Sequence, residues 1–346
     1  MKLIINIPHL KLQGGVSSHY KGLEPFWSVP KDYNVIGKRY GLPGIVFLPY
    51  DYLKFVLLCL FGGYTHVLLN PSLGKNAIKR DAVFLKIAKL FQKKVVVFFH
   101  GWSPDMVEKI NKQPKAFLSA YNKADKFIVL AKSIKSDLVK WGISKPIELS
   151  TTKINEELLE DFKWQAKSNK TFQLLFLSRI ETYKGIYEAL KTYQILKVQY
   201  PNCSLTVAGD GSQLDDVKNY VKEHLKDVSF LGHVSKDKLK SAFKNSDLYL
   251  LPSYSEGMPT TVLEAMAFGL PIVSRPVGGL VDFFENDKMG YLVESLEPQD
   301  FADKIALIVN NEAKLNTIAQ YNHNYAKQHF MASKVVKQLE EKIVNV

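Results

Sequence analysis

The sequence is poor in the residues that metal centres and disulfide-stabilised proteins need. It has two cysteines in 346 residues, Cys59 and Cys203, and their spacing fits neither a zinc site nor a disulfide framework. Its histidines other than His100 show no metal-ligand spacing either. We therefore expect a protein of a reducing compartment, the cytoplasm, with no metal site and no cofactor.

Long hydrophobic runs are also scarce. The most apolar window runs from Phe55 to Leu69, but Gly62 and Gly63 interrupt it and it is too short to span a bilayer. We interpret it as a helix end, a turn and a strand. The first ten residues, MKLIINIPHL, predict a buried strand, because a signal peptide has a longer apolar core and a small-residue cleavage site.

Acidic residues are rare in the first part of the chain. Residues 1–150 hold 23 Lys and Arg against 9 Asp and Glu, a net charge of +14, whereas residues 151–346 hold 23 against 25, a net of −2. Such an imbalance indicates the kind of partner rather than the fold. The first part is thus expected to meet something anionic, such as a membrane surface, an anionic substrate or a nucleic acid.

Short apolar runs alternate with helix-like stretches along the whole chain. The apolar runs of the first part are KLIINI, HVLLN, KVVVFFH, KFIVLA and KPIELS. After a polar connection at 151–170 the pattern restarts at FQLLFLS. This alternation predicts α/β architecture with two doubly wound, Rossmann-like domains facing across a cleft. We expect an N-terminal domain over 1–150, a second domain over 151–325, and a C-terminal helix over 326–346 that packs back on the first domain.

Ligands of such sheets bind beyond the carboxyl ends of the strands. SRIETYKG follows one predicted strand and places Arg179 and Lys184 there, two cations suited to a diphosphate. A surface ion pair of Arg179 with Glu181 is the structural alternative.

A second strand end carries two carboxylates around a helix start. In PSYSEGMPTTVLEAM, Glu256 precedes the predicted helix and Glu264 lies one turn inside it, while the N–H groups near Thr260 and Thr261 can receive an anion. Ionised carboxylates accept hydrogen bonds from vicinal hydroxyls, so the pair could hold a ribose and a sugar on either side of a diphosphate. The structural alternative, which each residue taken singly favours, is a helix-capping acid at Glu256 and an ordinary helix glutamate at Glu264.

Several segments together resemble a known family. Their order and spacing resemble those of the GT4 family of retaining glycosyltransferases with the GT-B fold, including its E-x7-E motif. The segments are FLSRIETYKG, LTVAGDGSQ, VSFLGHVS, DLYLLPSYSEGMPTTVLEAMAFGLPIVSRPVGG and GYLVE. In the first part, LQGGVSSHYKGL resembles the glycine-rich loop of that family, and VVVFFHGW resembles its strand ending in His-Gly.

The resemblance implies roles for individual residues. Arg179 and Lys184 would bind the donor diphosphate with the backbone of Thr260 and Thr261, and Glu264 would hold the ribose. The transferred sugar would contact Glu256 and the N–H groups of Gly257 and Met258. Gly14 and Gly15 would let the backbone approach the donor, and His100 would lie beside the anomeric carbon. The family is metal-independent and has no firmly assigned nucleophile, so we name no general base.

One basic helix in the first part is a candidate membrane surface. Between residues 75 and 94, Lys79, Lys86, Lys89 and Lys93 fall on a helical face beside an apolar face. A solvated face is the plain alternative, but the charge excess favours an anionic lipid surface.

The resulting hypothesis is a metal-independent, retaining hexosyltransferase of surface polysaccharide synthesis. It would use a UDP- or GDP-linked sugar and a glycan or lipid-linked acceptor, without nucleic acid, at the inner face of the cell membrane. A nucleotide-sugar epimerase of the same fold and a non-enzymatic binder of anionic lipid or nucleic acid are the alternatives.

Overall fold

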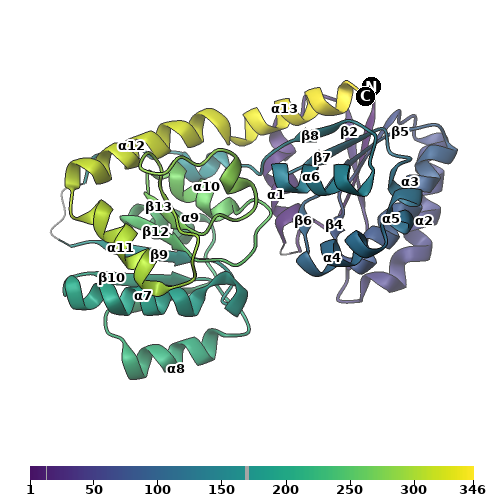
Figure 1. Ribbon diagram of the computed structural model, residues 1–346. Helices are drawn as coiled ribbons and strands as arrows, with labels where there is room; N and C mark the ends of the chain where they lie inside the picture. The colour runs from purple at the N-terminus through teal and green to yellow at the C-terminus, as the bar shows by residue number, and fades with distance from the viewer. Residues whose placement is uncertain (13, 168–170) are drawn as a thin grey trace. The chain divides into compact units, whose positions relative to one another are not determined.

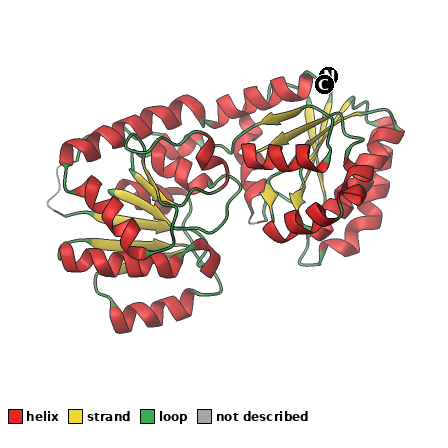
Figure 2. Ribbon diagram, in the orientation of Figure 1, coloured by secondary structure: helices red, strands yellow, loops and turns green. Residues whose placement is uncertain are grey.

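The structure, a computed structural model, describes residues 1–12, 14–167 and 171–346 (Figure 1). Its contacts divide the chain into two compact units. Unit 1 comprises Met1–Lys153 and Ala332–Val346, and unit 2 comprises Ile154–Met331. Each unit is built on one six-stranded parallel sheet with helices on both faces, so the predicted α/β class is confirmed (Figures 1 and 2). Residues 168–170 of the predicted connection lie outside the described residues.

The sheet of unit 1 has the strand order β2-β1-β3-β5-β7-β8, and every neighbouring pair is parallel. Its strands are β1 Leu3–Ile7, β2 Lys31–Val35, β3 His66–Leu69, β5 Lys94–Phe98, β7 Lys126–Val129 and β8 Ile147–Leu149. A separate two-stranded sheet pairs β4 Ser72–Leu73 with β6 Gly101–Trp102. Its helices are α1 Gly15–Leu23, α2 Gly44–Phe61, α3 Lys75–Leu90, α4 Pro104–Lys112, α5 Pro114–Tyr121, α6 Lys132–Trp141 and α13 Ala332–Val344.

The sheet of unit 2 has the order β11-β10-β9-β12-β13-β14, again all parallel. Its strands are β9 Gln173–Leu177, β10 Ser204–Ala208, β11 Val228–Gly232, β12 Leu248–Leu251, β13 Ile272–Ser274 and β14 Gly290–Leu292. Its α-helices are α7 Ile186–Gln199, α8 Leu214–His224, α9 Lys236–Lys244, α10 Thr260–Ala267, α11 Pro298–Val309 and α12 Glu312–His329.

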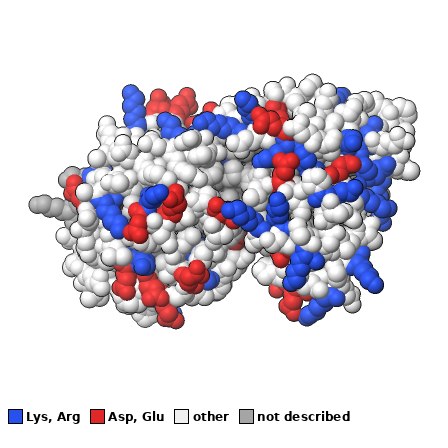
Figure 3. Space-filling model, turned by 45° about the horizontal axis from the view of Figure 1, so that its top comes forward, with Lys and Arg blue, Asp and Glu red and all other residues white. Residues whose placement is uncertain are grey.

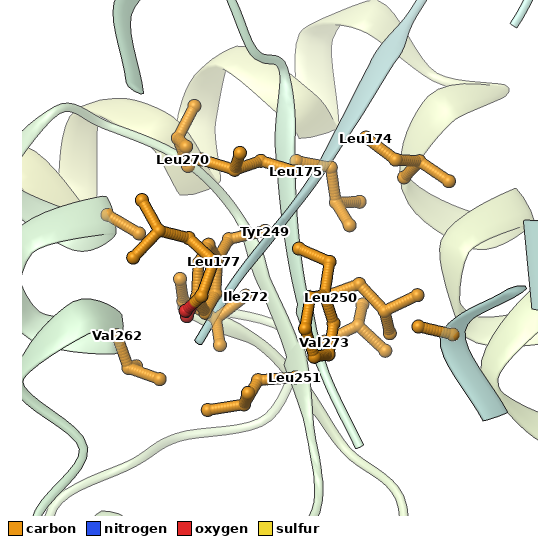
Figure 4. Close-up of a cluster of buried hydrophobic side chains, with 14 of the residues drawn as sticks. Leu174, Leu175, Leu177, Tyr249, Leu250, Leu251, Val262, Leu270, Ile272 and Val273 are labelled. Carbon is orange, nitrogen blue, oxygen red and sulfur yellow. The ribbon is translucent and has the colours of Figure 1, made fainter. Parts of the chain in front are cut away.

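The core of unit 2 lies on both faces of its sheet. Leu174, Leu250 and Ile272, from three neighbouring strands, are fully buried (Figure 4). Strands that are covered on both faces carry nearly continuous apolar runs, which is why these segments were recognisable in the sequence.

Two elements differ from the sequence-based expectation. The edge strand β2 was not predicted, because three of the five residues in KDYNV are Lys, Asp and Asn, which are depleted in strands. The helix predicted over 326–346 is two helices: residues 326–329 complete α12 in unit 2, and a break at Phe330 and Met331 precedes α13 in unit 1.

The apolar window from Phe55 to Leu69 is a helix end, a turn and a strand, as predicted. The helix itself begins earlier, at Gly44, and is apolar over almost its whole length. Within the described residues it is the one helix whose length and composition would allow it to cross a membrane, and only 17% of it is buried.

Candidate functional site

The loops after β9 and β12 form the candidate site of unit 2. These strands are neighbours in the sheet although β10, β11 and three α-helices separate them in the chain, so the strand order reverses direction between them. Such a switch point leaves a crevice at the carboxyl ends of the strands, where ligands of doubly wound sheets bind. The backbone N–H of Tyr254 donates to the carbonyl of Tyr183 at 2.9 Å and ties the two loops together.

Lys184 and Glu256 form an ion pair across this switch point. Lys184 Nζ lies 2.6 Å from Glu256 Oε1, and the two side chains are only 10% and 12% exposed. The sequence predicted both residues as ligand-binding groups but not that they would contact each other. A diphosphate that enters the site therefore meets a lysine whose charge is already partnered by a carboxylate.

Arg179 lies in the same loop with its side chain exposed. Its guanidinium carbon is 5.5 Å from the centre of the Tyr183 ring, a cation–π distance. Glu181 instead accepts hydrogen bonds from the N–H of Ser212 at 3.0 Å and from its hydroxyl at 2.7 Å. These bonds lower the pKa of Glu181, with a smaller contribution from Arg179. Among the described residues Arg179 forms no ion pair, so the surface pair with Glu181 is absent there.

The start of α10 is held against the end of β9 by a buried tyrosine. The hydroxyl of Tyr249 donates to the carbonyl of Leu177 at 2.7 Å and lies 2.7 Å from Thr261 Oγ1, which can donate to it. Burial raises the pKa of Tyr249, so it stays a neutral donor. Pro259 precedes the helix as its N-cap residue and forms no side-chain capping hydrogen bond with the described residues. Thr260 is half-buried at the first helical position, and Glu264 is buried one turn later.

Close backbone contacts of glycines hold these loops together. Gly185 follows Lys184 with a φ of +76°, and a Cβ at this position would lie 2.2 Å from the carbonyl oxygen of Pro252, just after β12. Gly278 has a φ of +55°, and a Cβ there would lie 2.2 Å from the carbonyl oxygen of Gly257. Residues with a side chain would push these loops apart. Met258 is half-buried and packs against the core.

In unit 1 the strand order reverses between β1 and β3, and the predicted residues lie near this switch point. Gly14 and Gly15 are exposed at the start of α1. Apart from their chain neighbours and the backbone of the helix itself, no heavy atom of the described residues lies within 4 Å of where a Cβ would be. His100 Nε2 lies 3.0 Å from Asn70 Oδ1, after β3. Tyr20 from α1 donates to the same oxygen at 2.6 Å.

His100 is a neutral side chain in this network. Burial lowers its pKa to about 3. Asn70 Nδ2 donates to a backbone carbonyl at 3.0 Å, which fixes Asn70 Oδ1 as the acceptor of the pair. His100 therefore donates through Nε2, and Nδ1 remains an acceptor.

His19 of α1 is a neighbour that sequence reasoning left as structural. Its ring centre lies 5.1 Å from that of His100. Both of its ring nitrogens are buried without a hydrogen-bond partner among the described residues. Burial lowers its pKa, with a smaller contribution from His100. Its place four residues after the glycine pair is the one sequence signal that could have marked it.

The four lysines predicted as one basic face differ in their exposure and in their position relative to α3. Lys79 and Lys86 are exposed on α3, as expected. Lys89 is half-buried, and its ammonium group binds the carboxylate of Asp125 at 2.9 Å. Lys93 lies beyond the helix, because α3 ends at Leu90, and the role of the four lysines as a membrane surface stays a prediction.

Within residues 1–12, 14–167 and 171–346, no three His, Cys, Asp or Glu side chains come together as a metal site would require. Metal independence stays a prediction.

Comparison with known proteins identifies the second unit. Residues 159–329 match the family model described as glycosyl transferases group 1. Over these residues, unit 2 is similar to the group 1 glycosyl transferases. The domain match covers the Arg179, Lys184, Glu256 and Glu264 positions but none of the first 150 residues.

Individual relatives agree with this assignment. An uncharacterized glycosyltransferase of Haemophilus influenzae is 33% identical over 44% of this chain and 43% of its own length. The capsular polysaccharide biosynthesis glycosyltransferase CapM of Staphylococcus aureus is 26% identical over 61% of this chain and 56% of its own. The matched regions thus span about half of these relatives.

A solved structure shares the fold of the whole chain. HepE of Anabaena, crystallised with UDP and glucose, superposes with a TM-score of 0.76 at 17% identity and full coverage of both chains. The two Rossmann-like units are therefore those of a GT-B glycosyltransferase fold.

Proposed function

We propose that this protein is a retaining, metal-independent glycosyltransferase of the GT4 type. It would transfer a hexose from a nucleotide-diphosphate sugar to a glycan or lipid-linked acceptor in surface polysaccharide synthesis. The observation that carries the proposal is the placement of Arg179, Lys184, Glu256 and Glu264 around one strand-order switch point in unit 2. The role of CapM in capsular polysaccharide biosynthesis supports the polysaccharide context.

Donor binding divides between the cations and the carboxylates of unit 2. The guanidinium of Arg179 and the N–H groups at the start of α10 would receive the diphosphate, with the ammonium of Lys184 beside Glu256. Glu264 would accept hydrogen bonds from the ribose, and Glu256 from the sugar, aided by the N–H groups of Gly257 and Met258. The complex of HepE with UDP and glucose supports a uridine nucleotide over a guanosine one.

The chemistry needs little beyond position and charge. The acceptor hydroxyl oxygen forms a bond to the anomeric carbon while the bond from that carbon to the phosphate oxygen breaks. The departing phosphate keeps the electron pair and takes the hydroxyl proton, on the same face of the sugar. The cations and the helix start would stabilise the developing negative charge of the leaving group. This pathway keeps the anomeric configuration without a protein nucleophile.

Unit 1 is proposed to bind the acceptor. Neutral His100 would offer Nδ1 as an acceptor beside the anomeric carbon, while Gly14 and Gly15 leave an open backbone for a phosphate or sugar. We place the protein in the cytoplasm, peripherally attached at the inner face of the cell membrane. The net charge of +14 over residues 1–150 supports that location.

The test is isothermal titration of the full chain with UDP, UDP-sugars and GDP-sugars. We expect one class to bind the wild type. Arg179→Ala and Glu264→Gln should each weaken binding by about tenfold or more, as loss of a charged hydrogen-bonding partner does. Lys218→Ala and Glu223→Gln, at exposed positions of α8, are the matched controls and should bind normally.

Product analysis then separates transfer from epimerisation. A transferase releases the nucleoside diphosphate only as a glycoside forms, and proton NMR of that glycoside should show the anomeric configuration of the donor. Failure of every nucleotide sugar to bind, or equal losses in the α8 controls, would overturn the proposed donor site.

A further inference from the structure

Helix α2 presents an apolar face to solvent. Its exposed positions recur at intervals of three and four residues, the spacing of one helical face. This stripe consists of Val46, Tyr50, Leu53, Leu57, Leu60 and Phe61. Leu53 is 62% exposed and Phe61 80% exposed. A single exposed leucine is ordinary, but a stripe that runs the length of an 18-residue helix is not.

The opposite face of α2 is anchored inside unit 1. Asp51, Phe55 and Cys59 are buried, each four residues after the last. The Phe55 ring packs edge-on against Phe84 of α3 at 5.1 Å. The carboxylate of Asp51 binds Arg39 at 2.6 Å. The helix therefore cannot leave the sheet domain to cross a bilayer without breaking this ion pair and exposing its packed face.

The charges around the stripe are of one sign. Helices α2 and α3 contain two acidic residues, Asp51 and Asp81, and both carboxylates are fully buried beside arginines. The exposed charges on these helices are lysines, among them Lys79 and Lys86 on the solvent face of α3. Leu90, which ends α3, is 77% exposed and adds apolar surface. Figure 3 shows more Lys and Arg, and fewer Asp and Glu, over unit 1 than over unit 2.

We infer that α2 lies in the plane of an anionic membrane surface, with its apolar stripe inserted at the boundary of headgroups and acyl chains. An interfacial helix of this kind needs an exposed apolar face and nearby cations, and the buried acids remove the charges that would oppose anionic lipid. Exposed tyrosines suit the headgroup region, and Tyr40, just before the helix, and Tyr50 provide them. A second copy of the chain is a poorer occupant, because it would bring two cationic rims together.

This assignment moves the membrane surface from the lysines of α3 to the apolar face of α2, with α3 as its cationic border. It does not depend on the transferase activity. It does rest on the proposed peripheral location, which a failure of lipid binding would overturn as well. The proposed donor site and transfer reaction keep their own tests, because lipid binding can be measured without any nucleotide sugar.

The experiment is flotation of the full chain with vesicles of phosphatidylglycerol and phosphatidylcholine, and with vesicles of phosphatidylcholine alone. We expect the wild type to float with the anionic vesicles at least about tenfold better. The double variant Leu53→Ser/Leu57→Ser should bind on the order of a hundredfold more weakly, from two lost apolar contacts. Val139→Ser, at a 57% exposed position of α6 in the same unit, is the matched control and should float like the wild type.

A second measurement reports insertion directly. An environment-sensitive fluorophore on Leu53→Cys should shift to the blue with anionic vesicles, whereas the same label on Val139→Cys should not. The native thiols are buried and should not take the label. Three outcomes would each overturn the inference. The serine double variant could float as well as the wild type, the wild type could fail to float, or the wild type could form a dimer that the double variant does not form.

Discussion

The buried ion pair between Lys184 and Glu256 allows a quantitative test of the candidate site. Glu256→Gln removes the negative charge but keeps the shape of the side chain, and it leaves the Lys184 ammonium, which is 10% exposed, without its partner. Removing one member of a buried pair commonly costs 3–5 kcal/mol. Because water still reaches both side chains, we expect the low end of this range. Glu256→Gln should lower the free energy of unfolding of unit 2 by about 3 kcal/mol.

The double variant Lys184→Met/Glu256→Gln should recover much of that loss, because it leaves no unpaired charge. The cycle of two single variants and one double variant should give a coupling energy of about 2 kcal/mol. Hydrogen exchange of the β9 and β12 amides measures the free energy of opening in the full chain.

The matched control is the pair Lys288 and Glu285 in the same unit. Its nitrogen–oxygen distance is 2.5 Å, but its side chains are 59% and 46% exposed. Solvent screening should make its coupling energy several-fold smaller. Equal coupling in the two pairs would refute the argument that burial, rather than distance, makes the Lys184 and Glu256 pair strong.

Three further predictions concern Gly185, Tyr249 and His100. Gly185→Ala should destabilise unit 2 by about 3 kcal/mol or more, because the new Cβ would lie 2.2 Å from the carbonyl that follows β12. Gly232→Ala should cost only about 1 kcal/mol by hydrogen exchange, because Gly232 has a φ of +63° but, its chain neighbours aside, no heavy atom of the described residues lies within 4 Å of the new Cβ. Tyr249→Phe should destabilise unit 2 by about 1–2 kcal/mol and weaken UDP binding several-fold in calorimetry, since Thr261 loses its partner at the start of α10. His100 should show no titration by NMR between pH 5 and 8, because its pKa is about 3. Between pH 6.5 and 3 the unfolded chain binds a proton at this histidine and the folded chain does not, so the free energy of unfolding should fall as the pH drops through this range.

Much of the fold could be predicted because parallel strands covered on both faces are continuous apolar runs. The strand QLLFL of β9 is an example, whereas KDYNV of β2, at the sheet edge, carries no such signal. The positions of Arg179 and Lys184 at a strand end were predictable for the same reason. Their neighbours were not, because the contact of Lys184 with Glu256 joins loops 72 residues apart.

The apolar stripe of α2 could not be predicted from the sequence, for a different reason. Residues 44–61 are apolar around the whole helix, so no periodicity in the sequence distinguishes the face that packs from the face that does not. Only the positions of the buried Asp51, Phe55 and Cys59 in the structure reveal the exposed stripe. The lysines of α3, by contrast, were visible in the sequence, but the pairing of Lys89 with Asp125 was not.

The return of α13 to unit 1 bears on how the chain folds during translation. The ammonium of Lys126, on β7, is almost fully buried and donates to the carbonyls of Lys342 and Asn345 at 2.9 and 2.8 Å. The N–H of Ser28 donates to Glu340 at 2.6 Å. Until the ribosome has made residues 332–346, Lys126 lacks two of its acceptors, and the last helix of unit 1 is missing. We expect unit 2, although synthesised later than most of unit 1, to be the first of the two to complete its fold.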